Sequence, residues 1–217
     1  MREYLRNCMI RRGSTMLLAF LMISLLTACT PNTPPATSAK PVIYLYPEED
    51  TRVEVNLDYH GELTATYPAY HGVWYVTARP DGTLIDDRGM EYSYLYWEGE
   101  TAREYDFSSG FVVKGEDTAE FLEDALDTLG LTRREANEFI VYWLPQLEPN
   151  PYNLIAFQGP AYTEGAVLTV SPEPDTVLRV FMAWKALEEP VDIPAQVLVT
   201  TPRDGFTLVE WGCAQVK

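Results

Sequence analysis

Residues 52–59 read Arg52-Val53-Glu54-Val55-Asn56-Leu57-Asp58-Tyr59 and alternate strictly between polar and apolar side chains. Because successive residues of a strand point to opposite faces, this period of two predicts a strand with one buried and one solvated face. A second alternating run extends from Glu62 to Tyr67, after only His60 and Gly61. A two-residue connection of this kind predicts a β-hairpin with His60 as a turn residue.

Further strands are predicted on both sides of this segment. The run Val42-Ile43-Tyr44-Leu45-Tyr46 is β-branched and aromatic and ends at Pro47, which is typical of a buried strand. The same reasoning predicts strands at 73–78, 83–85, 91–97, 154–157, 167–170, 177–185, 196–200 and 207–211. Residues 177–185 carry bulky side chains on both faces, so we expect this strand to be central.

The period changes to that of a helix near residues 117–145. Asp117 and Thr132 each precede a glutamate by three residues, the spacing of a capping box at a helix start. Gly130 is expected to end the first helix and Pro145 the second. We predict an α+β fold, a mainly antiparallel sheet, open or sandwiched, with an inserted helical hairpin. It forms a single globular domain over residues 41–217.

The N-terminal region has the order of a lipoprotein signal peptide. Basic residues precede the apolar run 16–26, and Leu26-Thr27-Ala28-Cys29 places a cysteine after two small residues. We predict that residues 1–28 are removed, that Cys29 carries the lipid, and that residues 29–40 form a flexible tether. Met9 opens a more compact basic segment and is an alternative start to Met1. The expected location is extracytoplasmic, with the protein anchored to the cell membrane.

The composition limits which classes of partner and cofactor are expected. The chain of 217 residues has 32 acidic and 16 basic residues, a net charge of −16. This charge argues against nucleic acid as a partner and leaves the acyl chains as the membrane anchor. Cys213 has no cysteine partner in the processed chain, so we expect a packed thiol. With two histidines and one available cysteine, we expect no His/Cys metal site, and we find no cofactor motif.

Aromatic side chains form the leading candidate for a functional site. The predicted ligand-binding residues are Trp74, Tyr92, Tyr94, Tyr96, Trp97 and Glu98. Their rings would stack on a glycan or hold a peptide, while Glu98 fixes its orientation. The alternative is cross-strand packing in the core, and exposure of the tyrosine face decides between the two.

The chain contains no standard catalytic motif, neither a nucleophile elbow nor a His-Glu-x-x-His sequence. A second hypothesis is a hydrolase of cell-wall or dietary polysaccharide that uses two carboxylates, for which Glu98 and Glu100 are eligible. A purely structural or interaction role is the third. Whether the protein is an enzyme stays open at this point, and no catalytic residue is assigned.

Three segments carry a resemblance to a known group of proteins. They are Lys40-Pro41-Val42-Ile43-Tyr44-Leu45-Tyr46-Pro47, Tyr92-Ser93-Tyr94-Leu95-Tyr96-Trp97-Glu98-Gly99 and Glu138-Phe139-Ile140-Val141-Tyr142-Trp143-Leu144-Pro145. With these, residues 40–212 resemble a family of uncharacterised exported, lipoprotein-like proteins of anaerobic Gram-positive bacteria. The resemblance implies an exported single domain at the outer face of one membrane. It implies no activity and no catalytic residue.

Overall fold

The computed structural model of the protein describes residues 36–216. The predicted signal peptide 1–28, Cys29 and the tether up to residue 35 lie outside the described residues. The strands are β1 (Ala36–Tyr46), β2 (Thr51–Tyr59), β3 (Glu62–Tyr67), β4 (Trp74–Ala78), β5 (Leu84–Ile85), β6 (Glu91–Tyr92), β7 (Leu95–Thr101), β8 (Phe111–Lys114), β9 (Tyr152–Gln158), β10 (Ala166–Ser171), β11 (Thr176–Leu187) and β12 (Thr207–Gln215). The helices are the 3₁₀ turn η1 (Gly115–Asp117), α1 (Thr118–Thr128), α2 (Arg133–Leu147) and the short α3 (Pro160–Thr163).

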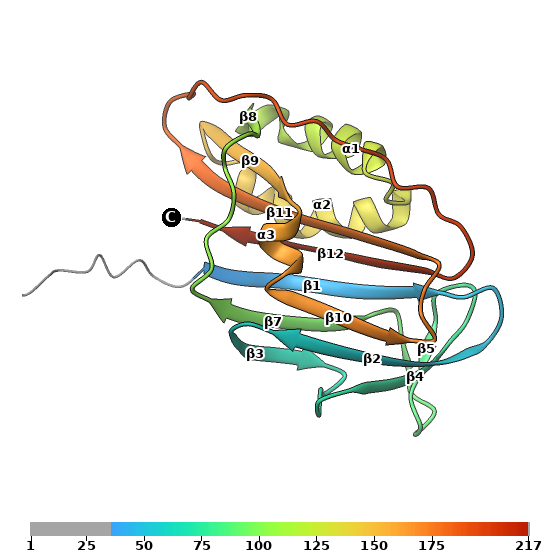
Figure 1. Ribbon diagram of the computed structural model, residues 1–217. Coiled ribbons are helices and arrows are strands. Elements are labelled where there is room, and N and C mark those ends of the chain that lie inside the picture. The colour runs from blue at the N-terminus through green and yellow to red at the C-terminus, as the bar shows by residue number, and fades with distance from the viewer. Residues whose placement is uncertain (1–35, 217) are drawn as a thin grey trace, which may run out of the picture. The chain divides into compact units, whose positions relative to one another are not determined.

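The strands form two sheets (Figure 1). The large sheet has seven strands in the order β3-β7-β1-β12-β11-β9-β8, and the small sheet has five in the order β10-β2-β4-β5-β6. Neighbouring strands are antiparallel except for β11 and β12, which are parallel. The predicted α+β fold, with mainly antiparallel sheets and an inserted helical hairpin, is confirmed.

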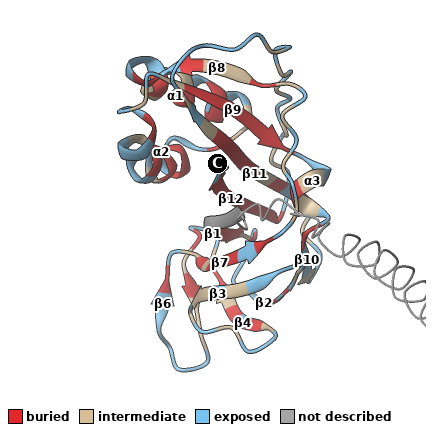
Figure 2. Cartoon of the chain, turned by 90° about the vertical axis from the view of Figure 1, so that its left-hand side faces the viewer, coloured by how far each residue is buried: buried red, intermediate tan, exposed pale blue. Residues whose placement is uncertain are grey.

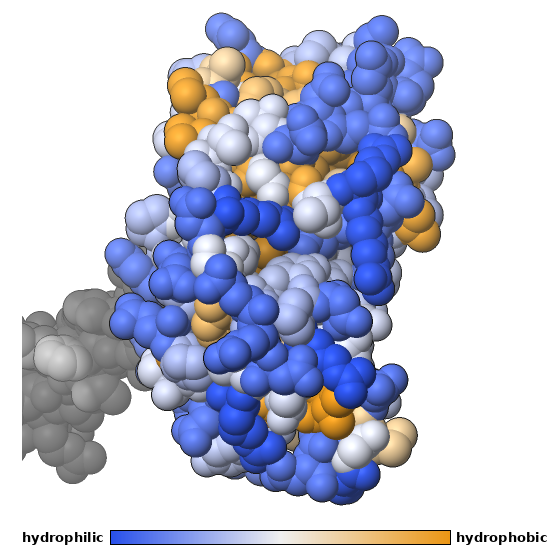
Figure 3. All heavy atoms as spheres, turned by 90° about the vertical axis from the view of Figure 1, so that its right-hand side faces the viewer, coloured by the Kyte–Doolittle hydropathy of each residue, from blue (hydrophilic) through white to orange (hydrophobic). Residues whose placement is uncertain are grey.

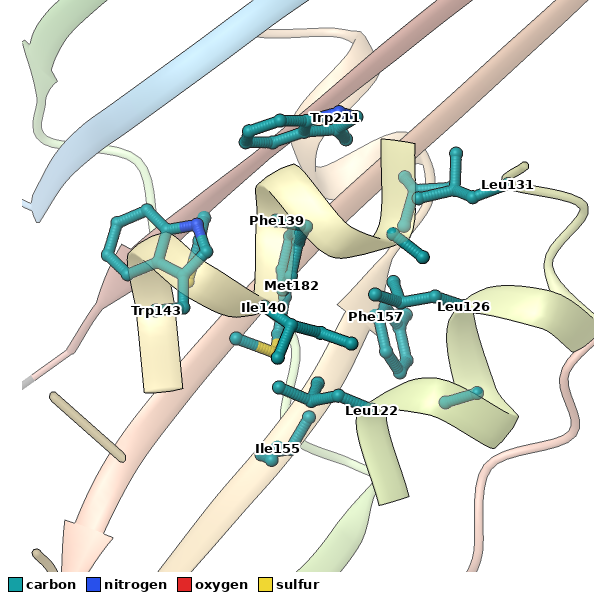
Figure 4. Packing of buried hydrophobic residues seen from close by; sticks show 14 of the residues in the cluster. Leu122, Leu126, Leu131, Phe139, Ile140, Trp143, Ile155, Phe157, Met182 and Trp211 are labelled. Carbon is teal, nitrogen blue, oxygen red and sulfur yellow. The ribbon is translucent and has the colours of Figure 1, made fainter. Parts of the chain in front are cut away.

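The large sheet is the middle layer, because its two faces contribute to two separate cores. The helix-side core joins one face to α1 and α2 and includes Phe139, Trp143 and Trp211 (Figure 4). The inter-sheet core joins the other face to the small sheet and includes Val55, Trp74 and Trp97. Burying each large apolar side chain contributes about 1.5–3 kcal/mol, so both layers stabilise the central sheet.

The central strands are buried on both faces, as their sequences predict. In β1, Val42 and Tyr44 enter the helix-side core, whereas Ile43 and Leu45 enter the inter-sheet core. All four side chains are at most 2% exposed. This explains the continuous apolar run, since a strand covered on both faces has no solvated side to keep polar.

The helix starts differ from each other. Thr132 forms the predicted capping box: its amide donates to Glu135 Oε2 at 2.8 Å, and its hydroxyl accepts from the Glu135 amide at 3.4 Å. The predicted cap at Asp117 is wrong, because its side chain makes no capping bond and η1 leads into α1 instead. Gly130 ends α1 with a φ of 96°, as expected. The prediction that Pro145 ends the second helix is wrong: α2 continues through it to Leu147, with the proline in its last turn.

The predicted hairpin at His60-Gly61 is wrong. Strand β2 pairs with β4 and β10 in the small sheet, whereas β3 pairs with β7 in the large sheet. The chain therefore changes sheets at these two residues, and the His60 amide donates to the carbonyl of Gly165 at 2.8 Å. Both strands were recognisable from their alternation, but alternation carries no information about the partner strand.

The crossing between sheets requires a glycine at position 61. A Cβ there would overlap the carbonyl oxygen of Glu100 and lie 2.7 Å from Cε1 of Tyr59. We expect Gly61→Ala to lower the free energy of unfolding by about 1–3 kcal/mol, because the Glu100 oxygen belongs to the β7 backbone and cannot rotate away. Urea unfolding measures this change. The exposed His60→Ala should stay within about 0.5 kcal/mol of wild type, and an equal effect of both variants would contradict the packing argument.

Two further strand predictions need correction. Residues 91–97 are not one strand: β6 belongs to the small sheet and β7 to the large sheet. Residues 196–200 form no strand, although Val197 is 84% and Val199 71% exposed while Leu198 packs on the helix-side core. This segment lies in the crossover between the parallel strands β11 and β12. Thr200 binds the carbonyl of Thr128 there at 2.7 Å, so a helix end and not a strand is its neighbour.

No helix among residues 36–216 combines the length and the apolar character that a membrane span needs. Cys213 is fully buried in the helix-side core, the packed thiol that we expected. Burial raises the pKa of this thiol well above its ordinary value, so it stays protonated at neutral pH.

Candidate functional site

The structure divides the six predicted ligand-binding residues between two layers. Trp74, Tyr92 and Trp97 lie in the inter-sheet core and are 3%, 9% and 0% exposed. Tyr94 and Tyr96 lie on the helix side of the large sheet, where they are half-buried against the helix-side core. Glu98 follows Tyr96 on the same face of β7. Alternation along β7 points Trp97 away from Tyr96 and Glu98, whereas Trp74 and Tyr92 belong to strands of the small sheet.

The three buried aromatic residues have partners within the protein. The Tyr92 hydroxyl donates to Asp86 Oδ2 at 3.0 Å. The indole of Trp97 donates to Glu210 Oε1 at 3.2 Å and its ring meets Tyr59 edge-on at 4.8 Å. The indole of Trp74 donates to the carbonyl of Pro68 at 2.8 Å. These contacts are those of core packing between two sheets.

The other face carries a row of large side chains across four neighbouring strands. In backbone register, Tyr67 of β3 lies beside Tyr96 of β7, then Val42 of β1, then Trp211 of β12, while the ring of Tyr67 meets that of Tyr92 edge-on at 5.5 Å. Exposure falls along this row from 63% for Tyr67 to 0% for Val42 and Trp211, which lie under α2. Figure 2 shows α2 above β1, β7 and β3, which continue the large sheet beyond the helix.

Residues of α2 and β1 complete this face. Tyr44 of β1 meets the ring of Tyr94 edge-on at 5.4 Å, and Tyr142 of α2 is 39% exposed and lies within electrostatic range of Tyr96. We call the following five residues the tyrosine cluster. They are Tyr44, Tyr67, Tyr94, Tyr96 and Tyr142. They come from four separate elements, β1, β3, β7 and α2, and from the β6–β7 link.

Two carboxylates lie among the tyrosines. Glu138 of α2 accepts from the Tyr44 hydroxyl at 2.7 Å and has Arg134 at 3.6 Å. Glu98 of β7 accepts from the Lys40 amide at 3.3 Å. Burial, and then the hydrogen bond to Glu98, raises the pKa of Tyr96; burial, and then Glu138, raises the pKa of Tyr44. Both phenols therefore remain hydrogen-bond donors at neutral pH.

Lys40 reaches the cluster through an irregularity in β1. The register shifts between residues 39 and 42 on the β12 side and between 38 and 42 on the β7 side, so both ladders are interrupted at Lys40-Pro41. Lys40 has a φ of 53°, in the left-handed region that non-glycine residues seldom adopt. Its Nζ lies 4.2 Å from the ring centre of Tyr142 and 5.5 Å from that of Trp211. A bulge thus directs a cation onto aromatic faces.

Sequence reasoning named Tyr94, Tyr96 and Glu98. The residues that it missed are Tyr44, Tyr67, Lys40, Glu138 and Tyr142. Residues 36–40, which we expected in the tether, belong to β1. Tyr142 carried a usable signal, because it falls off the apolar side of its helix, which Phe139, Ile140 and Trp143 occupy. Within residues 36–216, no group of three His, Cys, Asp or Glu side chains is arranged to hold a metal ion. The side opposite to that of Figure 2 is mostly hydrophilic, with small separate apolar patches (Figure 3).

Comparison with known proteins gives one informative relative. No family model matches the chain, and no solved structure matches it. The chain is 48% identical over 64 residues to "Uncharacterized protein in bglA 3′region" of Butyrivibrio fibrisolvens. This match spans 28% of the chain and 66% of that relative. The chain is therefore similar to an uncharacterised protein of an anaerobic Gram-positive bacterium, and no family is assigned.

Proposed function

We propose that the protein is a lipid-anchored extracytoplasmic binding domain that holds a glycan on its tyrosine cluster. The observation that carries this proposal is the gradient of exposure along the row from Tyr67 to Trp211. Its outer rings are accessible, whereas its inner members are fixed by the helix-side core. A rigid aromatic surface of this kind loses little side-chain entropy when a ligand binds.

The polar groups favour a glycan over a peptide. The Tyr44 hydroxyl donates to Glu138, and the Tyr96 hydroxyl bonds Glu98, so the cluster combines rings with phenols and carboxylates. A sugar presents hydroxyls that both donate and accept, together with a flat apolar face, and so matches this mixture. A peptide would be selected by pockets for its side chains. Binding of peptides and not of glycans would overturn this choice.

Binding should depend on the exposed part of the cluster. We expect Tyr96→Ala and Tyr142→Ala each to weaken glycan binding by about tenfold or more, because truncating a central interface aromatic costs more than about 1.4 kcal/mol. Calorimetry on a glycan identified by array screening measures the change.

Tyr75→Ala is the matched control for this experiment. Tyr75 is 43% exposed but lies on the small sheet beside Arg52, outside the cluster. Its truncation should leave the affinity unchanged. If the Tyr75 variant loses as much affinity as the Tyr96 variant, the tyrosine cluster is not the binding site.

The anchor has its own test. Cys29→Ser removes the thiol that would carry the diacylglycerol, so we expect the protein to leave the membrane fraction or to accumulate as an unprocessed precursor. Fractionation of cells with immunodetection measures this. Unchanged membrane association of the Cys29→Ser protein would exclude lipidation at Cys29 as the anchor.

A carboxylate-dependent hydrolase is the second candidate. Two carboxylates from different elements favour it, because both interact with Lys40. Glu98 of β7 accepts a hydrogen bond from the Lys40 amide, and Glu138 of α2 interacts electrostatically with the Lys40 ammonium. A hydrolase of cell-wall or dietary polysaccharide would need both carboxylates. Release of reducing ends that persists in Glu98→Gln and Glu138→Gln would rule out this pair.

A further inference from the structure

The β1 bulge gives Lys40 an environment that differs from that of a solvated lysine. The side chain is half-buried, and its ammonium lies over Tyr142 and against Trp211. Gly212 on β12 permits the bulge, since a Cβ there would lie 3.0 Å from Cα of Pro41. The backbone is held as well, through the amide of Lys40 on Glu98 and the left-handed φ. Left-handed backbone at a non-glycine residue persists only where the surrounding structure enforces it.

The ammonium lacks a hydrogen-bond acceptor within the described residues. No carboxylate among residues 40–216 lies within ion-pair distance of Lys40 Nζ, although the chain has twice as many acidic as basic residues. Glu138 acts on it only at longer range, and desolvation is the larger influence, so the pKa of Lys40 is lowered. The ring faces attract the cation, but they offer no oxygen or nitrogen acceptor for its three N–H groups.

We infer that Lys40 binds an oxyanion of the saccharide held by the tyrosine cluster, so that the preferred ligand is an acidic glycan carrying a carboxylate, sulfate or phosphate group. This inference rests on the proposed glycan binding. An oxyanion beside Nζ replaces the missing acceptor with a charge-assisted bond, while Glu98 and Glu138 take ligand hydroxyls. The rings of Tyr142 and Trp211 hold the ammonium in position before the ligand arrives, which reduces the entropic cost of binding.

The experiment compares charged and neutral probes on three lysine variants of the full chain. The probes are neutral oligosaccharides and their uronic-acid, sulfated and phosphorylated counterparts of equal length. Lys40→Met keeps the apolar stem on Tyr142 but removes the charge, and Lys40→Arg keeps the charge. Lys185→Met is the matched control, because Lys185 is also half-buried and its Nζ lies 4.7 Å from the ring of Phe107, far along the chain from the cluster.

We expect wild type to bind at least one class of acidic probe about tenfold more tightly than its neutral counterpart. Lys40→Met should remove this preference, so that acidic and neutral probes of equal length bind with similar affinity. Lys40→Arg and Lys185→Met should retain the preference. The class of acidic probe that gains most identifies which oxyanion the site takes.

Two outcomes would overturn the inference, and they are distinguishable from a failure of the proposed function. If Tyr96→Ala abolishes glycan binding but Lys40→Met weakens acidic and neutral probes equally, the cluster binds glycans and Lys40 selects no oxyanion. If wild type prefers neutral probes, the same conclusion follows. If wild type binds no glycan of either class, the proposed function and this inference both fall. Urea unfolding of Lys40→Met checks that a loss of preference is not a loss of folded protein.

Discussion

Arg203→Ala should lower the free energy of unfolding by about 3–5 kcal/mol, because it leaves a fully buried carboxylate without its counter-charge. Glu135 has a side chain that is 0% exposed, and it pairs with Arg203, which reaches it from the β11–β12 crossover. The same guanidinium donates twice to the carbonyl of Gly130, at 3.0 and 2.9 Å. Its loss would release both the end of α1 and the start of α2.

Arg133→Ala is the control for this prediction. Arg133 pairs with Glu123 at 2.6 Å, but these side chains are 66% and 47% exposed, so the pair contributes about 1 kcal/mol or less. Urea unfolding of both variants measures the difference. Equal destabilisation by Arg203→Ala and Arg133→Ala would show that the buried pair does not hold the helical hairpin. Adding Glu135→Gln to Arg203→Ala should recover part of the loss, since the buried charge is then removed.

Arg179→Met should have an effect of similar size in the inter-sheet core, again about 3–5 kcal/mol. The Nε of Arg179 donates to Glu210 Oε2 at 2.6 Å, and the two side chains are 10% and 1% exposed. Trp97 donates a further hydrogen bond to Glu210, and Tyr162 lies beside the pair. Without the arginine, Glu210 would remain buried, and its neighbours Trp97 and Tyr162 are both neutral groups.

The double variant Arg179→Met/Glu210→Met distinguishes the cost of an unpaired charge from the contribution of the pair. Two apolar side chains of similar volume would pack against each other and leave no buried charge. We therefore expect the free energy of unfolding of the double variant to be much closer to that of wild type than that of Arg179→Met alone. Chemical unfolding of the four proteins in the cycle gives the coupling energy. If the double variant is destabilised by the full sum of the two single changes, the charges do not act as a pair.

The strands and helices were predictable wherever a local pattern had a single physical cause. The alternation of residues 52–59 and the capping box at Thr132 both appear in the structure. The prediction was wrong where a local pattern has two readings. The pair His60-Gly61 fits a crossing between sheets as well as it fits a hairpin turn. The exposed Val197 and Val199 have the period of a strand, but their segment lies beside a helix end.

Three residues of the candidate site were predictable from the sequence. Tyr94, Tyr96 and Glu98 are neighbours in sequence, so a search for aromatic density found them. Trp74 and Trp97 belonged to the same aromatic-rich segment, but both are buried in the inter-sheet core, Trp97 on the opposite face of β7 and Trp74 on β4 of the small sheet. Lys40 and Tyr142 are far away in sequence and join the site only because β1 lies beside β7 and under α2.

The sequence by itself determined the alternating strand at 52–59, the buried strand at 42–46, the helix pair near 117–145 and an acidic composition. These properties follow from periods and capping signals that act over a few residues. Only the tertiary structure decided which sheet each strand joins, which aromatic residues are buried, and that Lys40 meets Tyr142. These outcomes depend on pairing between distant segments, for which the free energy comes from contacts that no local pattern encodes.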